Sequence, residues 1–179
     1  MIVRNATEQD RDALAAIYGD AVLHGFGTFE ETPPSPDEMA ARMRNILGRG
    51  LPYLVAEEAG RILGFAYAGP FRPRPGYRFA AEDSVYVAPD ATGRGVGRAV
   101  LGRVVEACEA LGLRQLVAVI GDSGNAGSIG LHRSLGFEDA GVGKSLGFKH
   151  GRWVDIVWMR KPLNGGDATL PTGPGIKVD

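Results

Sequence analysis

The chain has 179 residues, of which 44% are hydrophobic, and this length suits one domain with a buried core. Its formal net charge is only −1, so the composition gives no reason to expect a nucleic-acid partner or an anionic membrane surface. A single cysteine, Cys108, excludes an internal disulfide and a cysteine-rich metal site, and we expect it to be a buried apolar residue rather than a nucleophile.

The sequence also argues against export and membrane insertion. No apolar run is long enough to span a bilayer. The N-terminal residues MIVRNATEQDRDAL contain no basic segment followed by an apolar one, so a signal peptide is not expected. We therefore expect a cytoplasmic protein with no membrane partner.

The first half of the chain is predicted to contain a short strand, two helices and two further strands. The first strand covers 2–5, and Thr7 then precedes apolar residues at helical spacing. The sequence SPDE at 35–38 has an N-cap serine, a proline at the first helical position and a capping-box glutamate, so it predicts the start of the second helix. Two strands follow at 53–58 and 62–69.

The second half begins with a loop at 69–79 that is rich in proline, glycine and arginine. The elements predicted after it are, in chain order, a strand at 84–88, a helix that ends before Gly112, a strand at 115–120, a helix at about 125–135 and two strands near 137–142 and 153–161. This order indicates a mixed α/β sheet. We expect one domain over 1–163 and a flexible tail over 164–179, which is rich in glycine and proline.

A glycine-rich turn, 92-TGRGVGR-98, stands between the strand at 84–88 and the helix that follows it. Such a turn concentrates unpaired backbone N–H groups at the positive end of the helix dipole. Glycines at 93, 95 and 97 leave those donors open, and Arg94 and Arg98 can add charge-assisted hydrogen bonds. The turn therefore favours a phosphate or pyrophosphate ligand over a purely conformational role for its glycines.

Two common nucleotide-binding motifs do not fit the chain. A dinucleotide fingerprint that starts at Gly95 would need a glycine where Val100 stands. The run GKS at 143–145 is similar to the end of a P-loop, but Glu138 occupies the place of the first glycine and no helix is predicted to follow. Both nucleotide interpretations are therefore weak.

The sequence RGVG at 94–97, directly after a strand, resembles the pyrophosphate loop of the GCN5-related N-acetyltransferases (GNATs), which bind acetyl-coenzyme A (acetyl-CoA) there. Thr92 stands where this family usually has Gln or Arg. A second motif agrees, because Asn125, Ser128 and His132 share one face of a predicted helix. In the family, Asn at the first of these places lies near the pantetheine arm, and Tyr is common at the last.

The segments 69-GPFRPRPGYRF, 82-EDSVYV and 148-FKHGRWVD are similar to the phosphinothricin acetyltransferase branch of this family, which also acetylates methionine sulfoximine and related amino acids. The likeness covers about 1–163. It implies the GNAT fold, which is an α/β (α+β) architecture with a central, mixed, mostly antiparallel sheet of six to seven strands flanked by about four helices. It also implies acetyl-CoA as co-substrate, no metal, and a homodimer.

The resemblance gives roles to individual residues. Glu82 matches the catalytic glutamate of the branch and would accept the amine proton, directly or through a water. His132 would give a proton to the departing sulfur, hold a water, or position its neighbours. Asp83, beside the base, is expected to be a solvated or capping residue. The residues expected to bind acetyl-CoA are Val85, Tyr86, Val87, Arg94, Gly95, Val96, Gly97, Arg98, Asn125 and Ser128.

The loop at 69–79 contains the candidates for the acceptor site, Arg72, Arg74 and Tyr77. A positive, rigid loop suits a substrate that carries a carboxylate and a phosphinyl, sulfoximine or sulfone group. The branch commonly has Lys at the place of Arg72. Phe29 matches an aromatic residue that lines the acceptor pocket in the family, with core packing as the alternative.

These residues predict an N-acetyltransferase that acetylates the α-amino group of a small amino-acid-like acceptor, by direct amine attack in a ternary complex. One alternative is a GNAT with an aminoglycoside, a polyamine or a protein N-terminus as acceptor. The arginine loop disfavours the cationic acceptors, because like charges repel. The other alternative is a CoA-binding sensor without turnover, which the presence of both Glu82 and His132 disfavours.

Overall fold

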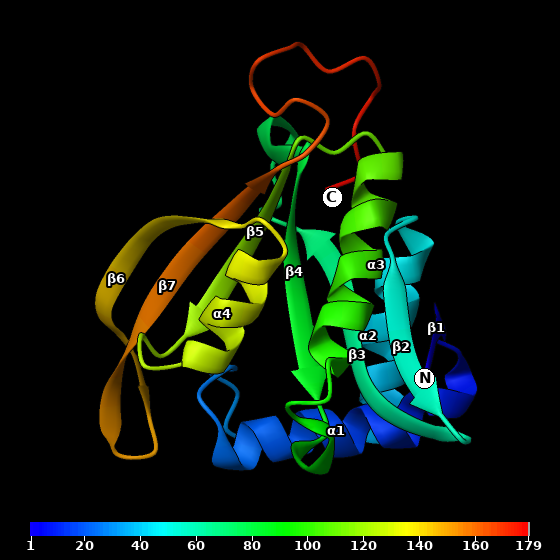
Figure 1. The fold of residues 1–179 in the computed structure, drawn as a ribbon, viewed down its shortest axis with the longest axis vertical. Helices are drawn as coiled ribbons and strands as arrows, with labels where there is room; N and C mark the ends of the chain where they lie inside the picture. The colour runs from blue at the N-terminus through cyan, green and yellow to red at the C-terminus, as the bar shows by residue number, and fades with distance from the viewer. Residues whose placement is uncertain (179) are drawn as a thin grey trace.

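The computed structural model of the protein describes residues 1–178 and contains one seven-stranded sheet with helices on both faces (Figure 1). Short 3₁₀ turns precede α1, β4 and α3. The helices and strands, in chain order, are β1 (Ile2–Asn5), α1 (Arg11–His24), α2 (Pro36–Gly48), β2 (Tyr53–Glu58), β3 (Arg61–Pro70), β4 (Ala80–Val87), α3 (Val96–Ala110), β5 (Gln115–Gly121), α4 (Ala126–Ser134), β6 (Glu138–Lys149) and β7 (Arg152–Pro162).

The strands are ordered β1-β2-β3-β4-β5-β7-β6 across the sheet. β4 and β5 run parallel, and every other neighbouring pair is antiparallel, so the expected mixed, mostly antiparallel sheet is confirmed. The parallel pairing is short. It joins Ala80–Asp83 to Gln115–Ala118, and beyond these residues the two strands separate (Figure 1). We call the resulting gap in the middle of the sheet the splay.

The helix boundaries follow from the local sequence. Ser35 is the N-cap of α2, where its side chain accepts a hydrogen bond from the N–H of Glu38 and Pro36 takes the first helical position. Gly112 and Gly136 follow α3 and α4 with φ angles of +75° and +84°. Glycine adopts this left-handed conformation without the strain that a Cβ would bring, so both helices end where the sequence predicts.

Successive side chains of β4 point to opposite faces of the sheet. Tyr86 faces α1, where its ring centroid lies 4.8 Å from that of Tyr18. Val87 faces α3, because its side chain lies 3.5 Å from where a Cβ on Gly97 would stand. α1 and α2 therefore cover one face of the sheet and α3 and α4 cover the other (Figure 1). The two faces of β4 give the two halves of the site described below.

Two strands are longer than the sequence predicts. β4 starts at Ala80, so Glu82 and Asp83 lie within the strand and not in a loop before it. β6 continues to Lys149 and forms a long hairpin with β7, in which the register shifts twice. Glycines and these irregularities interrupt the alternation that predicts a strand. The P-loop-like residues 143–145 lie in this strand, so that interpretation has no structural basis.

The segment after β7 runs back towards the loop before β4. The N–H of Ile176 donates to the carbonyl of Arg78 at 2.8 Å, and Val178 is buried. Arg114 donates to the carbonyl of Gly166, which holds the start of the segment. Asp179 lies outside the described residues, and the expected flexibility of 164–179 stays a prediction.

Candidate active site

The splay opens into two adjacent cavities. The narrow one, of about 120 Å³, is lined by residues of β4, β5 and α4. The wider one, of about 560 Å³, extends to the glycine turn before α3. The structure gathers nine of the ten residues expected to bind acetyl-CoA, all but Arg94, around these cavities: Val85, Tyr86, Val87, Gly95, Val96, Gly97, Arg98, Asn125 and Ser128.

The glycine turn presents the N-terminus of α3 to the wider cavity. Gly93 and Gly95 have φ angles of +74° and +78°, which would strain any residue with a Cβ. Gly97 differs, since a Cβ there would lie 3.0 Å from the side-chain end of Leu131 on α4, so glycine allows the two helices to approach closely. The first N–H groups of a helix have no partner within that helix. The turn can therefore offer them to an anion.

The two arginines of the turn already have protein partners. Arg94 donates to Glu58 at 2.5 Å, and Arg98 donates to the carbonyl of Ser134 at 3.1 Å. An anion at the turn would compete with Glu58 for the Arg94 guanidinium. The main-chain N–H groups are therefore the first ligands for an anion here, and the arginines add to them.

Asn125 is the N-cap of α4, and its side-chain carbonyl accepts a hydrogen bond from the N–H of Ser128 at 3.1 Å. Because the amide oxygen is used in this way, the NH₂ group is the part of Asn125 that can serve a ligand. Both residues line both cavities. This N-cap therefore fixes both the start of α4 and the part of the wall that the two cavities share.

Glu82 lies on the face of β4 that α1 and α2 cover, and one third of its side chain (33%) is exposed. Its Oε2 lies 3.5 Å from Nη1 of Arg72, whose guanidinium also stacks 4.3 Å from the ring centre of Phe71. Burial raises the pKa of Glu82, Arg72 lowers it, and the net shift is upward. A raised pKa makes the carboxylate a stronger base. The structure thus brings the candidate base and one candidate acceptor residue together.

The other acceptor candidates are distributed over two loops. Arg74 and Tyr77 are exposed in the same loop as Arg72, and the ring of Tyr77 makes an edge contact with Phe71. Phe29 lies in the loop between α1 and α2, where it is 37% exposed and packs against Gly147 of β6. Its contact is therefore with β6 rather than with the arginine loop.

Asp83 is the main correction to the expected site. It is 5% exposed and faces α3 and α4, where its Oδ2 lies 3.0 Å from Nε2 of His132. His132 is itself buried, and its Nδ1 lies 2.7 Å from the carbonyl of Ser128. The prediction that Asp83 is solvated or a cap is wrong. β4 starts earlier than expected, and strand alternation turns Asp83 into the core on the face opposite to Glu82.

The Asp83–His132 pair shares a proton. A carbonyl oxygen only accepts, so Nδ1 of His132 carries a hydrogen towards Ser128. Nε2 and the Asp83 carboxyl then hold one proton between them. Burial raises the pKa of Asp83. Burial is also the largest influence on His132 and lowers its pKa, but the hydrogen bond to Asp83, the charge of Asp83 and the hydrogen bond to the Ser128 carbonyl together outweigh it, so the net shift is upward. Among the described residues, Oδ1 of Asp83 has no hydrogen-bond partner.

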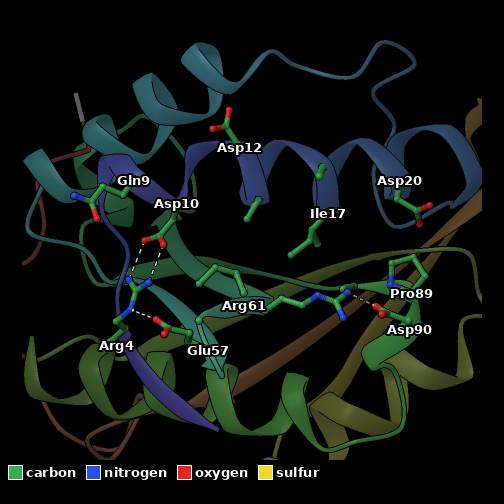
Figure 2. Close-up of a pocket in the computed structure, with 15 residues that line it drawn as sticks. Arg4, Gln9, Asp10, Asp12, Ile17, Asp20, Glu57, Arg61, Pro89 and Asp90 are labelled. Atoms are coloured by element: carbon green, nitrogen blue, oxygen red, sulfur yellow. Dashed lines mark hydrogen bonds and ion pairs between the residues drawn. The ribbon is translucent and has the colours of Figure 1, made fainter.

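A larger cavity, of about 840 Å³, lies between α1 and the turn that joins β2 to β3 (Figure 2). Neither candidate catalytic residue lines it, whereas His132 lines the narrow cavity at the splay; Glu82 lines none of the three. Within it Arg4 donates to Asp10 and Glu57, and Arg61 pairs with Asp90. Because its cations are already paired with its own carboxylates, this cavity offers an anionic ligand less than the glycine turn does. We place the candidate active site at the splay.

A family model described as the Acetyltransferase (GNAT) family matches residues 20–137, which is more than half of the chain. The chain belongs to the GNAT acetyltransferase family. The matched part of this GNAT domain begins in α1 and ends just after α4, so it includes the splay, the glycine turn, Glu82 and His132.

Individual relatives show which members of the family the chain is similar to. The GNAT domain is 55% identical to a phosphinothricin N-acetyltransferase from Alcaligenes faecalis, over 94% of this chain and 86% of the relative. It is 42% identical to an L-methionine sulfoximine/L-methionine sulfone acetyltransferase from Pseudomonas aeruginosa, over 90% of this chain and 94% of the relative. A crystal structure of a GNAT superfamily phosphinothricin acetyltransferase from Sinorhizobium meliloti in complex with AcCoA has a TM-score of 0.93 at 50% identity, covering 97% of this chain and 94% of that one. The expected family and fold are confirmed.

Among the buried polar residues of this GNAT domain, two beside the site are not anticipated from the sequence, because it predicts Asp83 in solvent or at a cap and gives Lys149 no role. Extending the predicted strand back to Ala80 would have placed Asp83 on the same face as Val85 and Val87. Lys149 gave no such signal, because lysine is rarely buried and its partners are main-chain carbonyls.

Proposed function

We propose that the chain is an acetyl-CoA-dependent N-acetyltransferase that acetylates the α-amino group of a small amino-acid-like acceptor, such as phosphinothricin, methionine sulfoximine or methionine sulfone. One observation carries the proposal: the two adjacent cavities at the splay, which we call the groove, share Val85, Asn125 and Ser128 in their linings, and the wider one reaches the N-terminus of α3. Glu82 lines neither cavity, but it stands next to Asp83, the last residue of β4 that pairs with β5. The names of the two relatives and the AcCoA complex of the similar structure support the same substrates.

The groove suits a long cofactor with a pyrophosphate. The main-chain N–H groups of 95–98 would bind the two phosphates. Asn125 and Ser128 would lie beside the pantetheine arm, where the NH₂ group of Asn125 can donate to it. A main-chain N–H of Val85–Val87 would stabilise the oxyanion that develops on the thioester carbonyl.

The transfer forms a C–N bond and breaks a C–S bond, so the attacking amine must lose a proton and the sulfur leaves as thiolate. Glu82 is the proposed base, directly or through one water, and its raised pKa supports this role because it improves proton acceptance near neutral pH. On the opposite face of β4, the two hydrogen bonds of His132 support a positioning role, in which the ring holds α4 and Ser128 beside the arm. Proton donation to sulfur would require Nδ1–H to leave the Ser128 carbonyl.

The acceptor would approach from the face of β4 that carries Glu82. Arg72, Arg74 and Tyr77 are proposed to bind its carboxylate and its phosphinyl, sulfoximine or sulfone oxygens, since guanidinium groups match such oxyanions. Phe29 is proposed to contact its aliphatic part. The contact between Arg72 and Glu82 supports this arrangement, because it places a cation next to the proposed base.

We propose that the protein forms a homodimer through the β6–β7 hairpin. Four large apolar residues of this hairpin, Val142, Leu146, Phe148 and Trp153, are each 50% exposed or more. β6 is also an edge strand, and proteins usually cover such strands. Analytical ultracentrifugation tests the dimer, and a monomer at working concentrations would contradict it. No helix among residues 1–178 is long and apolar enough to cross a membrane, and the cytoplasmic location stays a prediction.

The test of the proposed function is thiol release from acetyl-CoA with a panel of acceptors that includes phosphinothricin, methionine sulfoximine, methionine sulfone, a polyamine and an aminoglycoside. Glu82→Gln should lower kcat by about 10²–10⁴-fold, the usual contribution of a general base, while calorimetry shows unchanged binding of CoA. Glu106→Gln, on the exposed side of α3, is the matched control. CoA binding without thiol release for any acceptor would favour the sensor, and a Glu82→Gln variant with wild-type kcat would exclude Glu82 as the base.

A further inference from the structure

Lys149 is a fully buried lysine to which the proposed reaction gives no role. It lies at the end of β6, within the segment 148-FKHGRWVD, and is only 1% exposed. Its Nζ donates to the carbonyls of Gly25 and Thr28, at 2.9 Å and 2.8 Å. Burying a lysine is costly unless its donors are used. Both of its partners lie in the loop between α1 and α2, so one specific loop uses two of the three ammonium donors and offsets part of this cost.

The same loop makes three further contacts with the β6–β7 hairpin and with the end of β5. The ring of Phe26 lies under the guanidinium of Arg152, 3.9 Å from its centre, and makes an edge contact with His150. The carbonyl of Phe26 lies so close to Gly121 that a Cβ there would approach it to 1.8 Å. No residue other than glycine fits at that end of β5 while the loop holds this position.

Phe29 completes the contact. Its ring occupies the space above Gly147, where a Cβ would lie 2.1 Å from the nearest ring carbon. The first part of the loop, 25–29, is therefore held at Phe26 and at Phe29, and Lys149 is hydrogen-bonded to the main chain of Gly25 and Thr28 beside them. We call this set of contacts the loop dock.

The docked loop is a wall of the candidate active site. Gly27 lines the narrow cavity together with Ser84 and Tyr86, and Gly25 lines the wider one. The next residues of the loop are held by side-chain hydrogen bonds. The hydroxyl of Thr28 is hydrogen-bonded to that of Tyr18, and the carboxylate of Glu30 accepts hydrogen bonds from Tyr18 and Arg42. A shift of the loop would move this wall of the cavities and the ring of Phe29 at once.

We propose that Lys149 is a positioning residue for acyl transfer: by donating to the carbonyls of Gly25 and Thr28 it fixes the loop between α1 and α2 as the wall of the reaction cavity. This inference rests on the proposed function for its kinetic consequence, but the docking itself does not. Lys149 lines neither cavity of the site. It acts through the loop, so its loss should alter the fit of the acceptor more than the binding of the cofactor phosphates at 93–98.

Lys149→Met keeps an unbranched side chain that is one atom shorter and removes the donors. We expect it to raise KM for the acceptor by about tenfold or more and to lower kcat, since small misplacements of a substrate wall have large kinetic effects. The dissociation constant of CoA should change by less than about threefold, because the turn that would bind its phosphates lies on another element. Lys144→Met is the matched control. It lies on the same strand, is exposed and forms only a surface pair with Asp155, so it should behave as wild type.

The position of the loop is read without substrates by limited proteolysis with chymotrypsin, which cleaves after Phe26 and Phe29. Cleavage there should be faster in Lys149→Met than in wild type or Lys144→Met at a temperature where all are folded. If Lys149→Met does not fold, Lys149→Arg takes its place, because it keeps the charge but its longer side chain and planar guanidinium present their donors in a different geometry and should displace the loop. Unchanged cleavage, or an acceptor KM within about twofold of wild type in a folded variant, overturns the proposal. Absence of acetyl transfer in the wild type would instead overturn the proposed function and leave the proteolysis result to decide the docking.

Discussion

Replacing Asp83 with Asn removes the carboxylate that faces His132 in the core and keeps a side chain of the same shape. In the wild type the hydrogen bond to Asp83 raises the pKa of His132 in spite of its burial. The ring therefore keeps its proton as the pH rises, and this contribution to stability is present below the ordinary histidine pKa and is lost as the pH passes the folded one. In the variant, burial and the hydrogen bond to the Ser128 carbonyl remain, and burial is the larger influence, so the pKa of His132 falls and the folded ring is neutral.

The expected loss of stability in Asp83→Asn has a part that does not depend on pH and a part that does. Loss of one buried hydrogen-bond partner costs about 1–3 kcal/mol at any pH. Below pH about 6.5 the unfolded variant binds a proton that its folded state does not hold, which costs up to about 1.4 kcal/mol for each further pH unit, or about 2 kcal/mol at pH 5. The raised pKa of Asp83 acts in the same direction. A carboxyl that is protonated more readily in the folded state than in the unfolded state makes the wild type less stable as the pH rises, and the Asn variant lacks this loss. The destabilisation by Asp83→Asn should therefore be smallest near pH 8 and grow towards pH 5.

Urea unfolding followed by tryptophan fluorescence at pH 5, 6, 7 and 8 measures this difference. Asp139→Asn is the control, because Asp139 forms an exposed pair with Arg133 that should contribute little at any of these pH values. A destabilisation by Asp83→Asn that is independent of pH, or that grows towards pH 8, would refute the assignment of a shared proton to the buried pair.

Two further predictions concern the groove and the base. Arg72→Ala should raise KM for the acceptor. Because Arg72 lowers the pKa of Glu82, the same variant should move the acidic limb of the profile of kcat/KM against pH to higher pH. An unmoved limb would show that Arg72 does not act on the pKa of the catalytic base. Gly95→Ala should lose about 1–2 kcal/mol of stability, because φ is +78° there, and should weaken CoA binding in calorimetry, whereas Gly130→Ala on α4, where a Cβ meets open space, should do neither.

The sequence predicts the order of the elements well because their signals are local. The N-cap at Ser35 and the glycines after α3 and α4 act within a few residues of themselves, and they mark helix ends that the structure confirms. The long β6 strand could not be predicted in full, because its glycines carry no side chains to alternate and its register shifts. Its pairing partner, β7, is what makes it a strand.

The sequence predicted most residues of the candidate site, but it did not predict how they are arranged in space. The groove residues from the glycine turn and from the start of α4 come together as the family resemblance implies. The sequence did not reveal that Glu82 and Asp83 serve opposite faces, because that depends on where β4 begins. Nor did it reveal Lys149, whose partners are carbonyls 121 and 124 residues away in the chain.

Most proteins pair or hide the edges of their strands. This protein keeps two such edges inside its own sheet, on β4 after Asp83 and on β5 after Ala118, where the two strands diverge (Figure 1). Any occupant that carries amide groups in a line can satisfy both edges and take the place of an eighth, absent strand. Such a molecule would bind largely through main-chain hydrogen bonds. Substitutions at 84–87 would then change the shape of the binding site, while the unpaired main-chain groups of the two strands would remain available.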